Sequence, residues 1–147
     1  MEIRPLVVSD LPGVAGLYLE TFNAPPWNDG WSESAALERL RRYHDMADSV
    51  GVVAIEGAKV VGFALGMAER WVGGEHFHLK EMCTSPDRQR TGIGSLVLEE
   101  LMRILRDRGV EAIYLETRPQ SGAAEFYAKN GFRVLNLQSM TRGIDAV

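Results

Sequence analysis

A short run of polar residues and glycines, Gln89 to Ser95, has the composition of an anion-binding loop, with Gly92 and Gly94 one residue apart. The first turn of a helix has unpaired backbone N–H groups and a partial charge of about half a unit, so it attracts anions. Glycine lets that backbone approach a phosphate without an intervening Cβ. The run therefore fits a pyrophosphate site that needs no metal, and it also fits a turn that merely starts a helix.

The run differs from two common phosphate-binding motifs. A nucleoside-triphosphate P-loop needs a Gly-Lys-Ser/Thr sequence, and none follows Gly92. The dinucleotide fingerprint needs a third spaced glycine and a later acid that binds ribose. A nucleoside-triphosphate or dinucleotide site of either kind is therefore excluded.

Two predicted elements position this run. Residues 76–84 mix apolar and polar side chains as a strand does, and Pro86 ends the strand because proline cannot donate to a sheet ladder. Apolar side chains recur at helical spacing from Ile93 to Leu105. Gly109 stands where a left-handed residue would end that helix.

The run Gln89-x-x-Gly92-x-Gly94 resembles the Q/R-x-x-G-x-G/A signature of the GNAT N-acetyltransferase superfamily. A second run, Phe126-Tyr127-Ala128-Lys129-Asn130-Gly131-Phe132, resembles the F/L-Y-x-K-x-G-F signature of that family. The two runs stand in the family's order, and the surrounding pattern of elements is similar over nearly the whole chain. One position departs from the pattern: seven residues before Tyr127 the family often has asparagine, and this chain has Gln120.

The resemblance implies acetyl-CoA as the acetyl donor, with its pantetheine arm in a gap between the fourth and fifth strands. Pantetheine would pair with the backbone of Met82, Cys83 and Thr84, and a backbone N–H near Cys83 could polarise the thioester carbonyl. Gln120 and Tyr127 would complete the cofactor site. The pyrophosphate would bind the backbone amides of the loop residues Gln89, Arg90, Thr91, Gly92, Ile93, Gly94 and Ser95.

Acetyl transfer to an amine also needs a base. A lysine-like amine with a pKa near 10.4 is mostly protonated at pH 7, a handicap of roughly 4.6 kcal/mol. Glu81 is the candidate base, acting directly or through water, since relatives often carry a working acid on this strand. A second interpretation stays open, in which Glu81 faces solvent or pairs with Lys80 or Arg118.

Tyr127 is the candidate general acid, because the matching tyrosine protonates the departing CoA thiolate in many relatives. A phenol with a pKa near 10 is still protonated at pH 7, so it can donate a proton. Without the resemblance, an aromatic core residue beside Phe126 would be the favoured interpretation.

Cysteine and histidine offer weaker candidates. Cys83 could carry an acetyl-cysteine intermediate, but no base lies at a meaningful spacing, so a small buried hydrophobe is favoured. His76 and His78 share a strand face beside Glu75, but no third ligand follows at zinc spacing, so we expect no metal. His78 as an acceptor-site base is a weak alternative.

The acceptor site is expected at the loop that holds Trp27 and Trp31, at the second helix and at the Trp71–Glu75 turn, together with Glu81. A tryptophan can hold a cation by its ring face or cover an apolar acceptor. It can equally anchor the loop to the core. The resemblance implies that the acceptor is a primary amine of a small molecule or a peptide.

Composition excludes several other classes of protein. The 147 residues predict a single domain over 1–147, and 46% hydrophobic with 24% charged residues is ordinary for a soluble globular chain. Sixteen basic against 20 acidic residues, without a basic block, disfavour a nucleic-acid partner. No apolar run approaches the ~18–20 residues of a membrane span, and the N-terminus lacks the apolar region of a signal peptide. A lone cysteine excludes an intrachain disulfide and predicts a cytoplasmic location.

The pattern of elements predicts a mixed α/β fold of the order β-α-α-β-β-β-α-β-α-β-β, with about seven strands flanked by four helices. A helix between the strands at 76–84 and 112–117 indicates a parallel crossover. Helices are expected after Ser9, after Ser32, from Ile93 and at 123–130. Strands are expected at 3–8, 50–56, 59–71, 76–84, 112–117, 132–135 and 138–144.

The predicted function is N-acetyl transfer from acetyl-CoA to an amine by direct attack in a ternary complex. The first alternative is a domain of the same fold that binds acyl-CoA as a sensor or partner module without turnover, although Glu81 and Tyr127 argue against it. The second is a generic anion-binding α/β domain. Members of the family often dimerise, so a homodimer is a further outcome that the resemblance allows.

Overall fold

The computed structural model describes residues 1–145. The chain divides into two compact units, Met1–Glu116 and Thr117–Val147. Within the described residues, no helix is both long and apolar enough to cross a bilayer.

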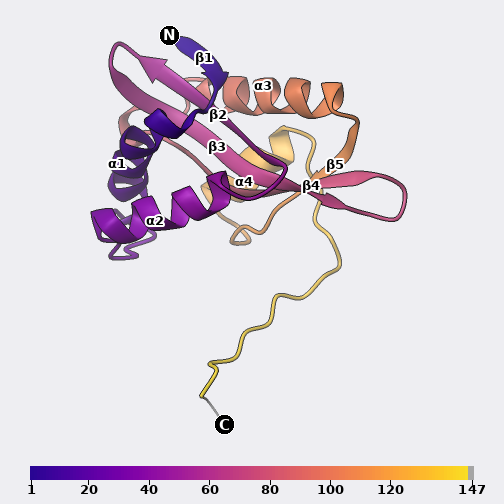
Figure 1. Ribbon diagram of the computed structural model, residues 1–147. Coiled ribbons are helices and arrows are strands. Elements are labelled where there is room, and N and C mark those ends of the chain that lie inside the picture. Colours follow the sequence, from indigo (N-terminus) through magenta and orange to yellow (C-terminus); the bar gives the residue numbers. More distant parts are fainter. Residues whose placement is uncertain (146–147) are drawn as a thin grey trace. The chain divides into compact units, whose positions relative to one another are not determined.

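The first unit is built on one sheet of five strands in the order β1-β2-β3-β4-β5 (Figure 1). Its first three pairings are antiparallel, and β4 pairs with β5 in parallel across the helix α3, as the predicted crossover requires. The strands are β1 Glu2–Pro5, β2 Ser49–Glu56, β3 Lys59–Arg70, β4 Glu75–Thr84 and β5 Val110–Tyr114.

Helices cover both faces of this sheet (Figure 1). Helices α1 Leu11–Phe22 and α2 Glu33–His44 enclose the hydrophobic core with Phe63 and Leu65 of β3. On the other face, a Cβ added at Gly62 would lie 3.0 Å from Cγ2 of Ile93, in helix α3 Ile93–Asp107. Because neighbouring side chains alternate across a strand, α3 lies opposite α1 and α2.

The helix ends show which local signals were effective. Ser32 caps α2 as predicted, with its Oγ accepting a hydrogen bond from the Ala35 amide at 3.1 Å. The predicted cap at Ser9 is wrong, because α1 begins at Leu11 after a 3-10 turn over Val8–Asp10. That turn also ends the first strand early, since the Val7 amide donates to the Asp10 carboxylate at 2.8 Å instead of extending the ladder.

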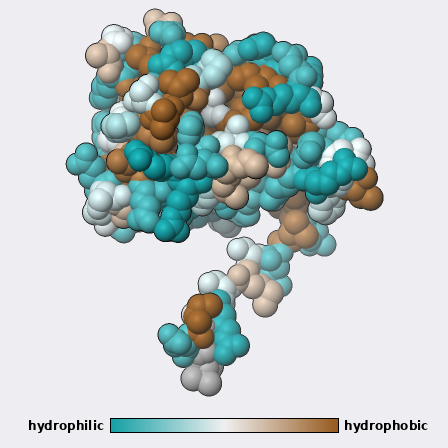
Figure 2. Space-filling model, in the orientation of Figure 1, coloured by the Kyte–Doolittle hydropathy of each residue, from teal (hydrophilic) through white to brown (hydrophobic). Residues whose placement is uncertain are grey.

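The outer face of α2 is polar. Only Ala36 and Leu40 of this helix are buried, and Figure 2 shows mostly hydrophilic residues over it. An inward stripe this narrow leaves the residues beside it, at the edge of the core, free to carry polar groups toward the sheet.

A β-bulge interrupts β4. Leu65 pairs with Glu81 and Gly66 pairs with Leu79, so Lys80 is an extra residue without a partner on β3. An extra residue reverses the alternation beyond it, so Glu81 lies on the same face of the sheet as His78. Gly66 is required at this point, because an added Cβ would lie 2.1 Å from the His78 carbonyl oxygen.

The pairing between β4 and β5 covers only the first part of β4. It runs from Glu75 to His78, where His78 pairs with Tyr114. Among residues 1–145, no strand pairs with Leu79–Thr84 on the β5 side. β5 ends at Tyr114, so the backbone of Leu79–Thr84 has no strand partner on the side where the gap is expected.

The second unit contains the helix α4 Gly122–Lys129, capped by Ser121 and followed by Gly131 at a φ of +90°. The predicted strands at 132–135 and 138–144 are wrong: none of residues 132–145 is in a strand, so the sheet has five strands and not seven. A strand persists only when its backbone pairs and its apolar side chains are buried. In this segment Val134 and Leu137 are 95% and 81% exposed.

Candidate active site

Glu81 follows the bulge of β4 and contacts both helices on its face of the sheet, α1 and α2. It is only 8% exposed. Its Oε1 accepts hydrogen bonds from the Tyr18 hydroxyl of α1 at 3.2 Å and from Arg39 Nε of α2 at 2.6 Å. Its recorded ion-pair partner is therefore Arg39, and burial this deep contradicts the part of the second interpretation in which Glu81 faces solvent.

Burial decides the electrostatics of this carboxyl. Loss of solvation raises the pKa of Glu81 above its usual value, and this effect exceeds the opposite effects of Arg39 and Tyr18. The pKa of Tyr18 is also raised, first by burial and then by the Glu81 charge. A buried carboxyl with a raised pKa is a better proton acceptor near neutral pH than an exposed one.

The second oxygen of Glu81 is available to a ligand. Both of its recorded hydrogen bonds go to Oε1. Over residues 1–145, the one buried side-chain polar atom without a partner is Thr21 Oγ1, so Glu81 Oε2 retains contact with solvent. Glu81 is thus anchored through one oxygen and open at the other.

Aromatic rings hold Arg39 in place. Its guanidinium lies 5.5 Å from the centre of the Trp31 ring and 5.1 Å from the centre of the Tyr43 ring. Trp31 contacts Tyr18 edge-on at 5.4 Å, and its backbone exchanges two hydrogen bonds with the Asn23 side chain. Trp31 therefore both anchors its loop and holds a cation, which is the chain's own Arg39.

Trp27, the other predicted acceptor residue, packs edge-on against Phe22 at 5.6 Å. The structure thus joins Trp31 to Glu81 through Tyr18 and Arg39, while the recorded ring contact of Trp27 is with the end of α1.

Sequence reasoning missed Tyr18 and Arg39 as site residues. The spacing of Tyr18 from Leu11, Val14 and Phe22 indicates only the apolar stripe of a helix. Arg39 stands between Ala36 and Leu40, the two buried residues of α2, so its position at the edge of the inward stripe was a usable signal.

The glycine loop leaves the start of α3 without a side-chain cap. Gly92 is the N-cap residue at a φ of +90°, and Arg90 also has a left-handed φ of +65°. The Gln89 amide group donates to the Thr84 carbonyl at 3.4 Å, which ties the loop to the end of β4. The uncapped first turn can donate backbone N–H groups to a diphosphate, and the untouched space at the Gly92 Cβ position permits close approach.

Cys83 is a poor nucleophile. Loss of solvation raises its pKa to about 12, so the thiol is protonated at neutral pH. Cys83 is partly buried and packs against the hydrophobic core beneath α1 and α2, as a small hydrophobe does.

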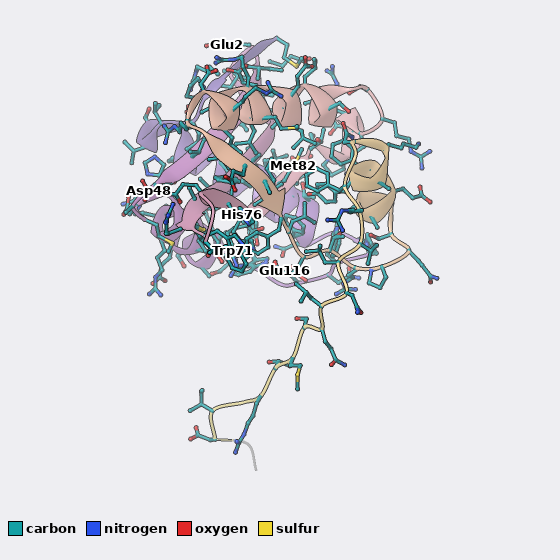
Figure 3. All side chains as sticks on the ribbon, turned by 90° about the vertical axis from the view of Figure 1, so that its right-hand side faces the viewer. Glu2, Asp48, Trp71, His76, Met82 and Glu116 are labelled. Atoms are coloured by element: carbon teal, nitrogen blue, oxygen red, sulfur yellow. The ribbon has the colours of Figure 1, made fainter. Side chains whose placement is uncertain are left out.

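The two histidines of β4 both have partners on or just after β5: His76 Nε2 lies 3.9 Å from Glu111 Oε2. His78 Nε2 lies 2.8 Å from Glu116 Oε2, and its ring stacks on Tyr114 at 4.2 Å. His76 stacks on Trp71 at 5.2 Å, and the two residues lie side by side in Figure 3. Throughout the described part of the chain, no three His, Cys, Asp or Glu residues come together as metal ligands would.

Tyr127 belongs to α4 in the second unit. Its ring contacts Phe126 at 5.3 Å and Phe132 at 5.4 Å, and its carbonyl accepts a hydrogen bond from the Phe132 amide. Gln120, just before this helix, has a left-handed φ of +55°. These observations describe local packing and backbone conformation and do not test cofactor binding, so the roles of Tyr127 and Gln120 stay predictions.

Known proteins match this chain at the levels of sequence and fold. The [Ribosomal protein bS18]-alanine N-acetyltransferase of Escherichia coli (strain K12) is 30% identical over 132 residues, 88% of this chain and 79% of that protein. The uncharacterized N-acetyltransferase YedL of the same strain is 32% identical over 80 residues, 52% of this chain and 48% of that protein. The chain thus spans about half the length of some curated relatives that it matches.

Solved structures share the fold. An acetyltransferase from Trypanosoma brucei superposes with a TM-score of 0.73 at 25% identity, over 96% of this chain and 98% of that one. An aminoglycoside N-acetyltransferase, AAC(6')-Iy, solved in complex with CoA, has a TM-score of 0.77 at 15% identity, over 97% and 94% of the two chains.

The sequence model of the acetyltransferase (GNAT) family matches residues 16–132. Members of this family take the acetyl group from acetyl-CoA. Because the match covers most of the chain and includes both predicted signatures, this protein belongs to the GNAT acetyltransferase family.

Proposed function

We propose that this protein moves an acetyl group from acetyl-CoA to a primary amine of a small molecule or peptide, by direct attack in a ternary complex. One observation carries the proposal: Glu81 is a buried carboxylate with one oxygen anchored and the other open, on the strand that parts from β5. A general base at the edge of a donor cleft needs this combination of fixed position and free acceptor atom.

The donor would lie along the open part of β4. When bound, acetyl-CoA supplies an acetyl group activated as a thioester. The backbone of Met82, Cys83 and Thr84, which β5 does not pair, would bind the pantetheine arm. The backbone amides from Gln89 to Ser95 would bind the diphosphate, and Gln120 would provide a further cofactor contact.

Two side chains would carry out the proton transfers, one as general base and one as general acid. Glu81, directly or through one water, would accept a proton from the acceptor's ammonium and leave a neutral amine to attack. As the C–N bond forms and the C–S bond breaks, the nitrogen would lose its second proton to solvent, and Tyr127 would give its phenolic proton to the departing sulfur and regain one from solvent. Both assignments are proposals; that of Tyr127 rests on the sequence resemblance alone.

Direct attack is favoured over a covalent acetyl-enzyme. The raised pKa of Cys83 keeps its thiol protonated, so the chain offers no activated sulfur beside the open strand. The non-catalytic alternative, an acyl-CoA sensor, has no use for a buried carboxylate with one open oxygen.

Two broader predictions accompany this function. We place the reaction in the cytoplasm, because a lone unpaired cysteine is typical of proteins in a reducing compartment. A homodimer is compatible with the family, and the oligomeric state can be measured by sedimentation.

The experiment is release of free thiol from acetyl-CoA by the pure protein across a panel of amines, with acetylated product identified by mass. Thiol release that depends on the amine supports the proposal. Calorimetric heat from CoA without any thiol release would favour the sensor instead. If CoA gives no heat at all, the cofactor assignment is wrong.

A further inference from the structure

The ion pair between Arg39 and Glu81 uses only part of each side chain. Arg39 donates to Glu81 through Nε. Arg39 also makes a side-chain hydrogen bond with Tyr18. Its side chain is 38% exposed against 9% for Glu81, and a guanidinium has five N–H donors, so these two contacts do not use them all. The pair therefore keeps one open acceptor oxygen, on Glu81, close to spare N–H donors on the partly exposed guanidinium of Arg39.

The conformation of Arg39 is restricted before any ligand binds. The Trp31 and Tyr43 rings both contact its guanidinium, and this reduces the conformational freedom that a long side chain would otherwise lose on binding. A planar guanidinium with spare N–H donors matches a carboxylate in a two-point contact.

The charge around Glu81 disfavours cationic acceptors. Lys80 Nζ lies 5.5 Å from the centre of the Tyr43 ring that also holds Arg39, so two cations surround one buried carboxylate. A polyamine or an aminoglycoside, with several ammonium groups, would be repelled here by like charge. An acceptor that brings its own negative charge would be attracted.

We propose that the acceptor is a free amino acid, and that Arg39 selects it by binding its carboxylate while Glu81 receives its ammonium. An α-amino acid carries these two groups on neighbouring atoms, as the open groups of the Arg39–Glu81 pair require. A peptide N-terminus has an amide in place of that carboxylate and would leave Arg39 unsatisfied. This inference rests on the proposed function and deepens it.

The test compares each free amino acid with its own carboxamide, for example phenylalanine with phenylalaninamide. Thiol release from acetyl-CoA gives kcat/KM for both members of each pair. For the best acceptor we expect the free acid to be preferred by about tenfold or more, the value of a charge-assisted contact.

Variants on one helix isolate the role of Arg39. Arg39→Gln should bring the acid-to-amide ratio close to one, and Arg39→Lys, which keeps the charge but not the planar fork, should retain part of it. Arg42→Gln is the matched control, because Arg42 of the same helix makes an exposed pair with Glu38. Its ratio should equal that of the unchanged protein.

Binding separates this inference from the proposed function. Calorimetry with the CoA-saturated protein measures the same acid and amide pairs without turnover. Preferred binding of the free acid without thiol release would support the amino-acid site and contradict the enzyme. Thiol release with equal use of acid and amide, a preference for polyamines, or an unchanged ratio in Arg39→Gln would each overturn the inference and leave the enzyme standing.

Discussion

The two parts of β4 have opposite surroundings although they form one strand. The first part, Glu75–His78, is paired on both sides, by β3 and by β5, and its histidines are engaged with the β5 side. The second part, Leu79–Thr84, is paired by β3 alone and carries Glu81 under α1 and α2. The comparison shows a division of roles along one strand. Pairing on both sides holds the first part in the sheet, whereas the second part has unpaired backbone groups and a carboxylate that can bind ligands.

The largest expected effect tests whether the base lies in the unpaired part. Glu81→Gln keeps the size of the side chain and removes its ability to accept a proton. We expect kcat/KM to fall about 100-fold or more, as for loss of a general base. Thiol release at several pH values measures it. Activity near that of the unchanged protein would move the base elsewhere.

The next effect concerns the junction between the two parts. Gly66→Ala places a Cβ 2.1 Å from the His78 carbonyl oxygen and against the Phe77 ring, so the bulge must shift. We expect a loss of ~1–3 kcal/mol or more in the free energy of unfolding, measured with urea. Gly16→Ala is the control: no atom lies within 4 Å of its Cβ position, and helix propensity predicts a gain of ~0.5–1 kcal/mol.

A third test asks whether the unpaired part needs an acid from the second unit. Tyr127→Phe retains the ring that packs on Phe126 and Phe132 and removes the proton donor. Turnover should fall at least about tenfold, while calorimetry should find nearly unchanged affinity for acetyl-CoA. Unchanged turnover would remove Tyr127 from the mechanism.

A smaller effect should appear in the pH dependence. Burial raises the pKa of Glu81, and the carboxyl is inactive as a base while protonated, so kcat/KM should rise with pH through that pKa. Arg39 lowers the same pKa, so Arg39→Gln should move the rising limb to higher pH, and Glu81→Gln should abolish it. If the rise in kcat/KM occurred at the same pH in Arg39→Gln, Arg39 would not be lowering the pKa of the base, and the ion pair would be contradicted.

Folding stability should depend on pH in the opposite sense. With a folded pKa above the unfolded one, the contribution of Glu81 is complete below the unfolded pKa and is lost as pH rises through the folded value. Urea unfolding of the unchanged protein and of Glu81→Gln at several pH values measures this difference.

The smallest effect is expected in the paired part of β4. His78→Gln removes a ring that stacks on Tyr114 and a contact with Glu116. We expect kcat/KM to stay within about twofold, because no open group of the site depends on this ring. A large loss would make His78 the acceptor-site base and reverse the comparison between the two parts.

Periodic signals in the sequence predicted what depends on local pattern. The strand, glycine loop and helix from residue 75 to 107, the β2–β3 hairpin and the Ser32 cap are all present. Glu81 follows from the resemblance. Helical spacing places Tyr18 on the inward face of α1 and Arg39 beside the inward stripe of α2, but it cannot show that both contact Glu81, because contacts between distant elements leave no periodic trace.

Two other features escaped prediction for physical reasons. The bulge at Lys80 inserts a single residue, which does not disturb composition or hydrophobic content; its one sequence signal was Gly66 on the opposing strand. The last two predicted strands have apolar residues of suitable spacing, but strand formation requires a partner backbone, which the segment itself cannot specify.

The bulge also affects how this strand should be compared with related sequences. Glu81 and His78 share a face although they are three residues apart, and Leu79 and Glu81 lie on opposite faces although they are two apart. Removing Lys80 would make Leu79 and Glu81 neighbours that alternate normally, so the acid would keep its face. Relatives with and without the extra residue can therefore present an equivalent carboxylate at positions that differ by one when counted from the start of the strand.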